Sequence, residues 1–126
     1  MLRVCASSGK PVGSPLSKTI LIIEDDTVFL QQVCTVLRRA GHRVLSATNV
    51  SDAEEIWAMG RERIDIVLSD HVLGFDRGAD LVQRFKTHQP ETKIVLCSGS
   101  PVDFEHAGIE FLLKPFTASM LLAAAA

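Results

Sequence analysis

The sequence has few cysteines, and none of them is arranged as in a disulfide framework or a metal site. Among its 126 residues there are three cysteines, Cys5, Cys34 and Cys97, and no Cys-x-x-Cys pair. An odd number of widely spaced cysteines argues against a disulfide scaffold and against a zinc site. We therefore expect a reducing, cytoplasmic location, with Cys34 and Cys97 acting as small buried hydrophobic side chains.

The sequence also lacks a long apolar run and an excess of either charge. No run reaches the roughly 18 residues that a membrane-spanning helix requires, and the start of the chain has no continuous apolar segment of the secretory-signal type. The formal net charge is −2, whereas nucleic-acid binding needs a clustered basic face. We therefore expect neither a membrane span nor a direct nucleic-acid partner.

The remaining composition is typical of one folded domain. Apolar residues make up 47% of the chain, which is enough for a substantial core at this length. Residues 1–17 are rich in serine, glycine and proline, so we expect them to form a leader or linker. The domain itself is predicted to span residues 18–126.

Short apolar runs alternate with amphipathic segments along this domain. This alternation predicts an α/β fold with a doubly wound five-stranded parallel sheet of order 2-1-3-4-5, flavodoxin-like, in which the fourth helix is shortened. Ser51-Asp52-Ala53-Glu54 is interpreted as a capping box at a helix start. The expected strands are 20–23, 42–47, 64–69, 93–97 and 109–113; the expected helices are 27–40, 51–60, 78–88, a turn or two within 101–107, and 115–126.

Polar residues follow four of the expected strands, at the edge where such folds bind ligands. They are Glu24-Asp25-Asp26, Asp70, Ser98-Gly99 and Lys114-Pro115. Carboxylates brought together repel one another, and a hard cation such as Mg²⁺ together with a lysine would compensate for that repulsion. Such a site is suited to holding a phosphoryl group in line with a carboxylate nucleophile.

Four segments resemble, in order, the signature segments of response-regulator receiver domains, the CheY-like modules of two-component phosphorelays. Each segment alone has low specificity, but the four together at strand ends are highly specific. They are Ile20–Asp26, Ile66–Asp70, Ile94–Gly99 and Phe111–Phe116, and the resemblance extends over about residues 18–122.

The resemblance implies a signalling domain that is not an enzyme beyond its own phosphorylation and dephosphorylation. Such a domain takes a phosphoryl group from a histidine kinase or phosphotransfer protein and then shifts between two conformations. By this resemblance Asp70 is the phosphoacceptor, Ser98 is the switch hydroxyl, and Lys114 pairs with the phosphoryl group, ahead of a cis proline. Phe111 takes the place of the switch aromatic. Homodimerisation is compatible with the resemblance but not required by it.

The resemblance also implies a set of ligands for Mg²⁺. Asp25 and the Asp70 carboxylate would bind the ion directly, Glu24 would act mostly through water, and Val72 would offer its backbone carbonyl. Val72 has no polar side chain at a position that often tunes the lifetime of the acyl phosphate. The interval from Ser98 to Lys114 is shorter than in the common pattern, which is why a shortened fourth helix is expected.

Other readings of the same residues remain open at this point. A pseudo-receiver would keep the fold as a protein-interaction module without phosphorylation, although the acidic residues, serine and lysine are all present. The short Ser-Gly-Ser-Pro segment also resembles receivers excised from hybrid histidine kinases. An aspartate-nucleophile phosphatase is disfavoured because Glu24 stands at its first motif position. A flavodoxin-type nucleotide binder would need phosphate donors after the first strand in place of acids.

Overall fold

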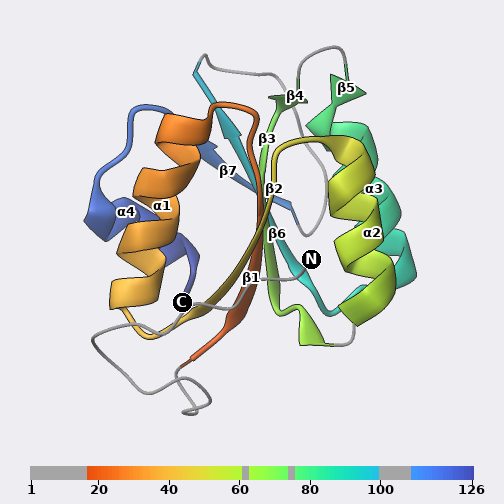
Figure 1. Cartoon of the computed structure of the whole chain (residues 1–126), viewed down its shortest axis with the longest axis horizontal. Coiled ribbons are helices and arrows are strands. Elements are labelled where there is room, and N and C mark those ends of the chain that lie inside the picture. Colours follow the sequence, from red (N-terminus) through yellow and green to blue (C-terminus); the bar gives the residue numbers. More distant parts are fainter. Residues whose placement is uncertain (1–16, 61–62, 74–75, 100–108) are drawn as a thin grey trace.

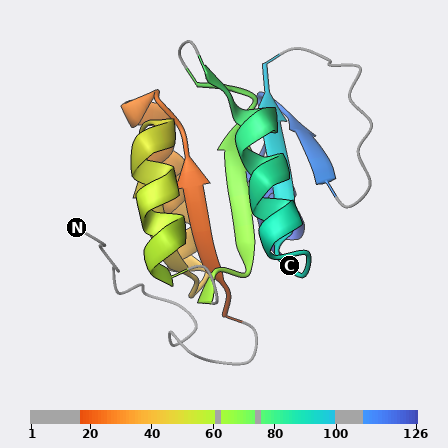
Figure 2. The same ribbon diagram turned by 90° about the vertical axis from the view of Figure 1, so that its right-hand side faces the viewer.

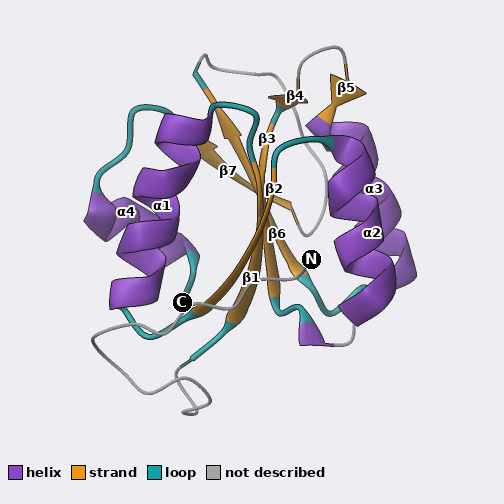
Figure 3. Cartoon of the chain, viewed as in Figure 1, coloured by secondary structure: helices purple, strands orange, loops and turns teal. Residues whose placement is uncertain are grey.

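A computed structural model describes residues 17–60, 63–73, 76–99 and 109–126, and shows a parallel sheet between two layers of helices (Figures 1 and 3). The apolar runs form the strands, and the segments with helical periodicity form the helices. The elements are β1 (Thr19–Ile23), α1 (Thr27–Arg39), β2 (Arg43–Ala47), α2 (Val50–Gly60), β3 (Ile66–Asp70), β4 (Val72–Leu73), β5 (Asp76–Arg77), α3 (Gly78–His88), β6 (Lys93–Ser98), β7 (Ile109–Leu113) and α4 (Ala118–Ala124).

The main sheet has the order β2-β1-β3-β6-β7, and all of its neighbouring strands are parallel. Because β6 and β7 are the fourth and fifth strands of this sheet, the predicted order 2-1-3-4-5 is confirmed. Connections run to opposite sides of the sheet from β1 and β3, so the edge beyond their carboxyl ends is the switch point of the fold. Among the described residues, no helix is both long and apolar enough to cross a membrane.

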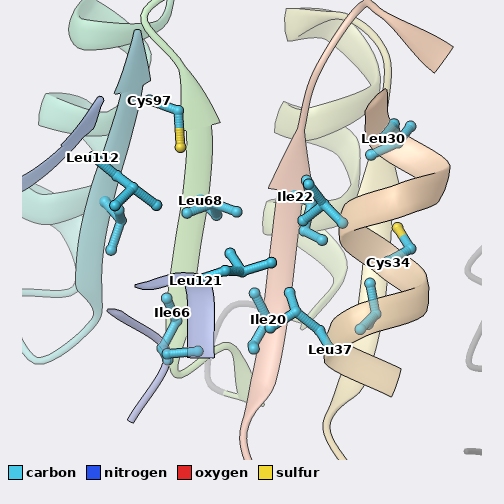
Figure 4. Packing of buried hydrophobic residues seen from close by; sticks show 14 residues of the cluster. Ile20, Ile22, Leu30, Cys34, Leu37, Ile66, Leu68, Cys97, Leu112 and Leu121 are labelled. Atoms are coloured by element: carbon cyan, nitrogen blue, oxygen red, sulfur yellow. The ribbon is translucent and has the colours of Figure 1, made fainter. Parts of the chain in front are cut away.

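The central strands β1, β3 and β6 are buried on both faces, as continuous apolar runs predict, whereas the edge strands β2 and β7 also carry exposed residues. Along β1, Leu21 and Ile23 lie in one core and Ile20 and Ile22 in the other. We call these the α2/α3 core, which also includes Val67, Leu81, Phe85, Ile94 and Leu96, and the α1/α4 core, which also includes Leu30, Leu37, Leu68, Cys97 and Leu121. Figure 4 shows side chains of the α1/α4 core.

The helices divide between the two faces as the two cores require. Helices α1 and α4 cover one face, and α2 and α3 lie side by side on the other (Figures 1 and 2). Between α2 and α3, the Trp57 and Phe85 rings stack with their centroids 4.3 Å apart, which confirms that Trp57 is a packing residue. Cys34 and Cys97 are buried in the α1/α4 core, as expected from their apolar surroundings.

The start of α2 differs from the predicted capping box. The helix begins at Val50, and the cap is Asn49, whose side-chain oxygen accepts a hydrogen bond from the Asp52 N–H at 2.8 Å. The Asp52 carboxylate accepts one in return from the Asn49 amide at 3.1 Å. The cap is therefore Asn49, two residues before the predicted Ser51, and its reciprocal partner is Asp52.

Three further segments differ from the expectations or lie beyond them. The final helix begins at Ala118 and not at Pro115, because Thr117 is its N-cap and accepts a hydrogen bond from the Met120 N–H at 3.1 Å. The Lys114-Pro115 peptide bond is cis, as the resemblance implied. A two-stranded antiparallel sheet, β4 with β5, follows Asp70 and was not predicted. The expected short helix within 101–107, and with it the shortening of the fourth helix, falls outside the described residues, as do residues 1–16.

The cap of α2 provides a test of where this helix starts. Replacing Asn49 with Ala removes an acceptor for a backbone N–H of the first turn, and should lower the free energy of unfolding by about 1 kcal/mol. Ser51→Ala, within the helix, should change it by less than about 0.5 kcal/mol. Urea unfolding followed by circular dichroism measures both. A larger loss for Ser51→Ala than for Asn49→Ala would contradict the observed cap.

Candidate functional site

An acidic cluster lies at the carboxyl ends of the two central strands. Glu24 directly follows β1, with Asp25 next in the chain, and Asp70 is the last residue of β3. Because β1 and β3 are neighbours in register, with Ile23 opposite Ser69, the chain must bring these acids together. One carboxylate oxygen from each of the three residues lies within 4.8 Å of the others. Glu24 is buried, Asp70 is partly buried and Asp25 is exposed.

The third acid of the first segment has a structural role. The Asp26 carboxylate caps α1, accepting hydrogen bonds from the N–H groups of Val28 and Phe29, both at 3.1 Å. The Asp26 N–H in turn donates to Glu24 Oε2 at 3.3 Å. The cap thus fixes the first turn of α1 against the acidic cluster, and leaves Glu24 and Asp25 as the acids of this segment that face Asp70.

Lys114 connects the acidic cluster to the far strand of the sheet. It follows β7, and its backbone N–H donates to the Ser98 carbonyl at 2.6 Å. Its ammonium Nζ lies 2.7 Å from Glu24 Oε1 and 3.4 Å from Asp70 Oδ1. It also lies 4.4 Å from the centre of the Phe29 ring. A single cation from the end of β7 therefore contacts two carboxylates at the ends of β1 and β3 and a ring in the first turn of α1.

The charges in this cluster do not balance. Burial raises the pKa of Asp70 above its ordinary value, and the opposing effect of Lys114 does not cancel this increase. The pKa of Glu24 is raised by burial too, despite its hydrogen bond to Lys114. Burial lowers the pKa of Lys114, but the hydrogen bond that Lys114 donates to Glu24 and the charge of Asp70 outweigh burial and leave this pKa raised. Three carboxylates thus face one ammonium.

The donor set of the cluster fits a hard divalent cation. All of its candidate ligand atoms are carboxylate oxygens, with no sulfur or imidazole in the group. Mg²⁺ and Ca²⁺ prefer oxygen ligands, and Mg²⁺ is commonly held by one or two carboxylates with water and phosphate oxygens. Such an ion would also offset the excess negative charge. Glu24, Asp25 and Asp70 are the residues that could hold it.

Ser98, His71 and Phe111 lie toward the other face of the sheet. Along β6, Leu96 faces the α2/α3 core and Cys97 the α1/α4 core, so the alternation of the strand directs Ser98 to the same face as Leu96. Phe111 packs against the α2/α3 core, and its ring centroid lies 6.2 Å from that of His71. The His71 N–H donates to the Cys97 carbonyl at 2.8 Å, which ties the end of β3 to β6.

The thiol nearest the cluster is unreactive. Burial raises the pKa of Cys97 to about 12, while the nearby Lys114 lowers it only in part. Because the thiolate is the nucleophilic form, this sulfur is a packing group at neutral pH. The groups of this site that can react or bind a ligand are therefore its carboxylates and its lysine.

The structure brings most of the sequence-predicted residues to one edge of the sheet. Glu24, Asp25, Asp70 and Lys114 form one contact group. Ser98 is buried at the adjoining strand end. The backbone of Val72 lies in β4, two residues beyond Asp70, and a role for its carbonyl stays a prediction.

Sequence reasoning missed one residue of this edge, Phe29. Its position three residues after the Asp26 cap was the available signal, because a cap fixes which side chains the first helical turn presents. The spacing from the cap could not predict that Lys114 is the neighbour of Phe29, because Lys114 lies 85 positions later in the sequence.

The fold and this edge define a class before any relative is considered: a doubly wound α/β domain with acids and a lysine at its switch point. A family model described as the response regulator receiver domain matches residues 20–126. The chain therefore belongs to the response regulator receiver domain family, as the four segments predicted. Members of this family are signalling modules of two-component systems, and this chain is a phosphoaccepting receiver domain.

Individual relatives agree with this assignment. The chain is 31% identical over 117 residues to the 3',5'-cyclic-nucleotide phosphodiesterase regA of Dictyostelium discoideum, covering 86% of the chain and 15% of that protein. It is 32% identical over 110 residues to the autoinducer 1 sensor kinase/phosphatase LuxN of Vibrio campbellii, covering 83% of the chain and 13% of that protein. The chain thus spans a small part of these curated relatives.

The fold of the chain also matches that of a solved response regulator. It is a response regulator protein from Burkholderia pseudomallei with a phosphorylated aspartic acid, a calcium ion and citrate. The match has a TM-score of 0.75 and 27% sequence identity, and covers 85% of this chain and 65% of that one.

The charge imbalance predicts how stability depends on pH. Because Asp70 has a raised pKa in the folded state, its ionisation costs stability as pH rises from the ordinary carboxyl range through that raised value. Asp70→Asn should therefore raise the free energy of unfolding at pH 7 when no divalent cation is present. The gain should shrink as pH falls through the raised pKa of Asp70 toward the ordinary carboxyl range, and should be absent below that range.

Urea unfolding with a chelator present, at several pH values, measures this gain. Asp80→Asn is the matched control, because Asp80 is exposed on α3, outside the cluster. An Asp70→Asn protein that is less stable than the unaltered chain at pH 7 would show that the lysine contact outweighs burial of the carboxylate.

Proposed function

We propose that Asp70 is the residue of this receiver domain that accepts the phosphoryl group. The observation that carries the proposal is the placement of its partly buried carboxylate at the switch point, 3.4 Å from the Lys114 ammonium and beside Glu24 and Asp25. The carboxylate is a nucleophile, and the surrounding groups neutralise charge on the group being transferred.

The transfer replaces one bond to phosphorus with another. An Asp70 carboxylate oxygen attacks the phosphorus of a phosphohistidine, the phosphorus–nitrogen bond breaks, and the imidazole leaves with the bonding electron pair. The product is an acyl phosphate on Asp70. Lys114 would contact a phosphoryl oxygen. Ser98, at the neighbouring strand end, would turn toward the phosphoryl group and donate its hydroxyl to another oxygen. Water later hydrolyses the acyl phosphate and restores the carboxylate.

A divalent cation is part of the proposed site. Glu24, Asp25 and Asp70 would hold Mg²⁺, with the Val72 backbone carbonyl as a further ligand. The ion supplies positive charge beside the transferred oxygens. The Burkholderia pseudomallei structure of the same fold has a phosphorylated aspartic acid and a calcium ion, which supports the proposal of an aspartyl phosphate and a hard cation in this domain.

The partner in transfer is proposed to be a histidine kinase or a phosphotransfer protein. The likeness to a sensor kinase/phosphatase, which is much longer than this chain, supports a receiver that works beside a kinase in a phosphorelay. Three further points stay predictions: a possible homodimer, no direct contact with nucleic acid, and a cytoplasmic location. Readout would pass through Ser98 and Phe111, whose positions on the other face of the sheet allow a shift in one to affect the other.

Labelling with a small phosphodonor tests the acceptor. With Mg²⁺ and radiolabelled acetyl phosphate, the unaltered chain should acquire up to one acid-stable, alkali-labile phosphoryl group, and Asp70→Asn should lose at least about 95% of the label, because the amide is not a nucleophile. Asp80→Asn should label like the unaltered chain. Equal labelling of Asp70→Asn would refute the proposal, and no labelling of the unaltered chain would favour a pseudo-receiver.

Thermal unfolding in the presence of Mg²⁺ tests the metal site. Mg²⁺ at about 100 times its dissociation constant should stabilise the unaltered chain by about 2.7 kcal/mol, because the ion binds only the folded state. Asp25→Ala should lose most of this stabilisation. Asp80→Ala, which removes an exposed acid elsewhere, should keep it. A melting-temperature increase of the same size in Asp25→Ala would show that the ion binds away from the cluster.

A further inference from the structure

The Lys114 ammonium has a third neighbour besides its two carboxylates, and that neighbour is an aromatic ring. Nζ lies over the Phe29 ring, 4.4 Å from its centre. A cation within about 6 Å of a ring centre and over its face is attracted by the ring's negative quadrupole. This attraction is stronger where water is excluded, and the side chain of Lys114 is only 22% exposed.

The position of the Phe29 ring is fixed by contacts that do not involve Lys114. Its backbone N–H donates to the Asp26 cap at 3.1 Å, in the first turn of α1. Its ring meets Phe116 edge-to-face, with centroids 5.6 Å apart and an interplanar angle of 73°. A hollow between α1 and α4 brings Phe29 and Phe116 together with Val33 and Leu121. The ring is therefore a fixed part of the helix layer.

The carboxylate contacts of Lys114 differ from the ring contact in one respect. Glu24 and Asp70 belong to the acidic cluster, and a phosphoryl group on Asp70 would change the charge and the space that surround the ammonium. The ring belongs to α1, outside the cluster, so the ring's own position does not depend on what occupies the cluster. It limits how far the flexible lysine side chain can turn toward α1.

We propose that Phe29 is a positioning residue for phosphoryl transfer: its ring face holds the Lys114 ammonium on the side of Asp70. This inference rests on the proposed function of the site. It deepens that function by assigning part of the lysine's placement to an apolar residue of α1. The property that matters is the ring's charge distribution, and a side chain of similar volume without a π-face would not supply it.

The test compares Phe29→Leu, which removes the ring, with Phe29→Tyr, which keeps it. The rate of labelling by acetyl phosphate and the affinity for beryllofluoride, both with Mg²⁺, should fall about threefold to tenfold in Phe29→Leu. That range corresponds to about 0.7 to 1.4 kcal/mol. Phe29→Tyr should stay within about twofold of the unaltered chain. Val36→Ala, which loses packing on the same helix away from the lysine, should also stay within about twofold.

A second measurement reports the contact itself. Protons on the carbon next to Nζ of Lys114 should show an upfield ring-current shift in NMR spectra of the unaltered chain and of Phe29→Tyr, and the shift should vanish in Phe29→Leu. Equal rates for Leu and Tyr variants, or an unshifted lysine in the unaltered chain, would overturn the proposal. If the unaltered chain does not label, the proposed function fails, and the chemical shift still decides whether Phe29 holds Lys114.

Discussion

The charged contact between Lys114 and the carboxylates at the ends of β1 and β3 is the constraint on which the site depends. Three acids share a small volume beside one ammonium, and two of them are partly or fully withdrawn from water. Desolvation makes this arrangement unfavourable for the carboxylates, as their raised pKa values show. The same excess of negative charge favours binding of a cation at this edge of the sheet, and with it a phosphoryl group.

The doubly wound sheet explains why this arrangement can form at all. In a parallel sheet the carboxyl ends of all strands lie at one edge. Residues that directly follow different strands therefore lie close together, even where they are far apart in the sequence. The pleat then separates roles by face. Asp70 and Lys114 contact each other beside α1, while Ser98 and Phe111 turn toward the α2/α3 core. A phosphoryl group bound at the edge would therefore lie between two layers that can respond separately.

Sequence patterns predicted the large features well because those features depend on local chemistry. The run Ile20–Ile23 could only be a strand buried on both faces, and the acids directly after it had to lie at the edge of the sheet. Predictions failed where two local signals competed. Ser51 and Asn49 are both good caps, and the structure uses Asn49 because its side chain and that of Asp52 satisfy each other. Pro115 suggested a helix start, but Thr117 supplies the cap, and the helix begins at Ala118.

The sequence alone determined the fold class, the strand order, and the identity of Glu24, Asp25, Asp70, Ser98 and Lys114 as the residues at the sheet edge. It could do so because alternation and strand-end positions are properties of short segments. Only the tertiary structure decided that Asp26 caps α1, that Lys114 reaches both Glu24 and Asp70, and that Phe29 lies beneath the ammonium. These contacts join segments up to 90 residues apart, and their distances follow from how helices pack on the sheet.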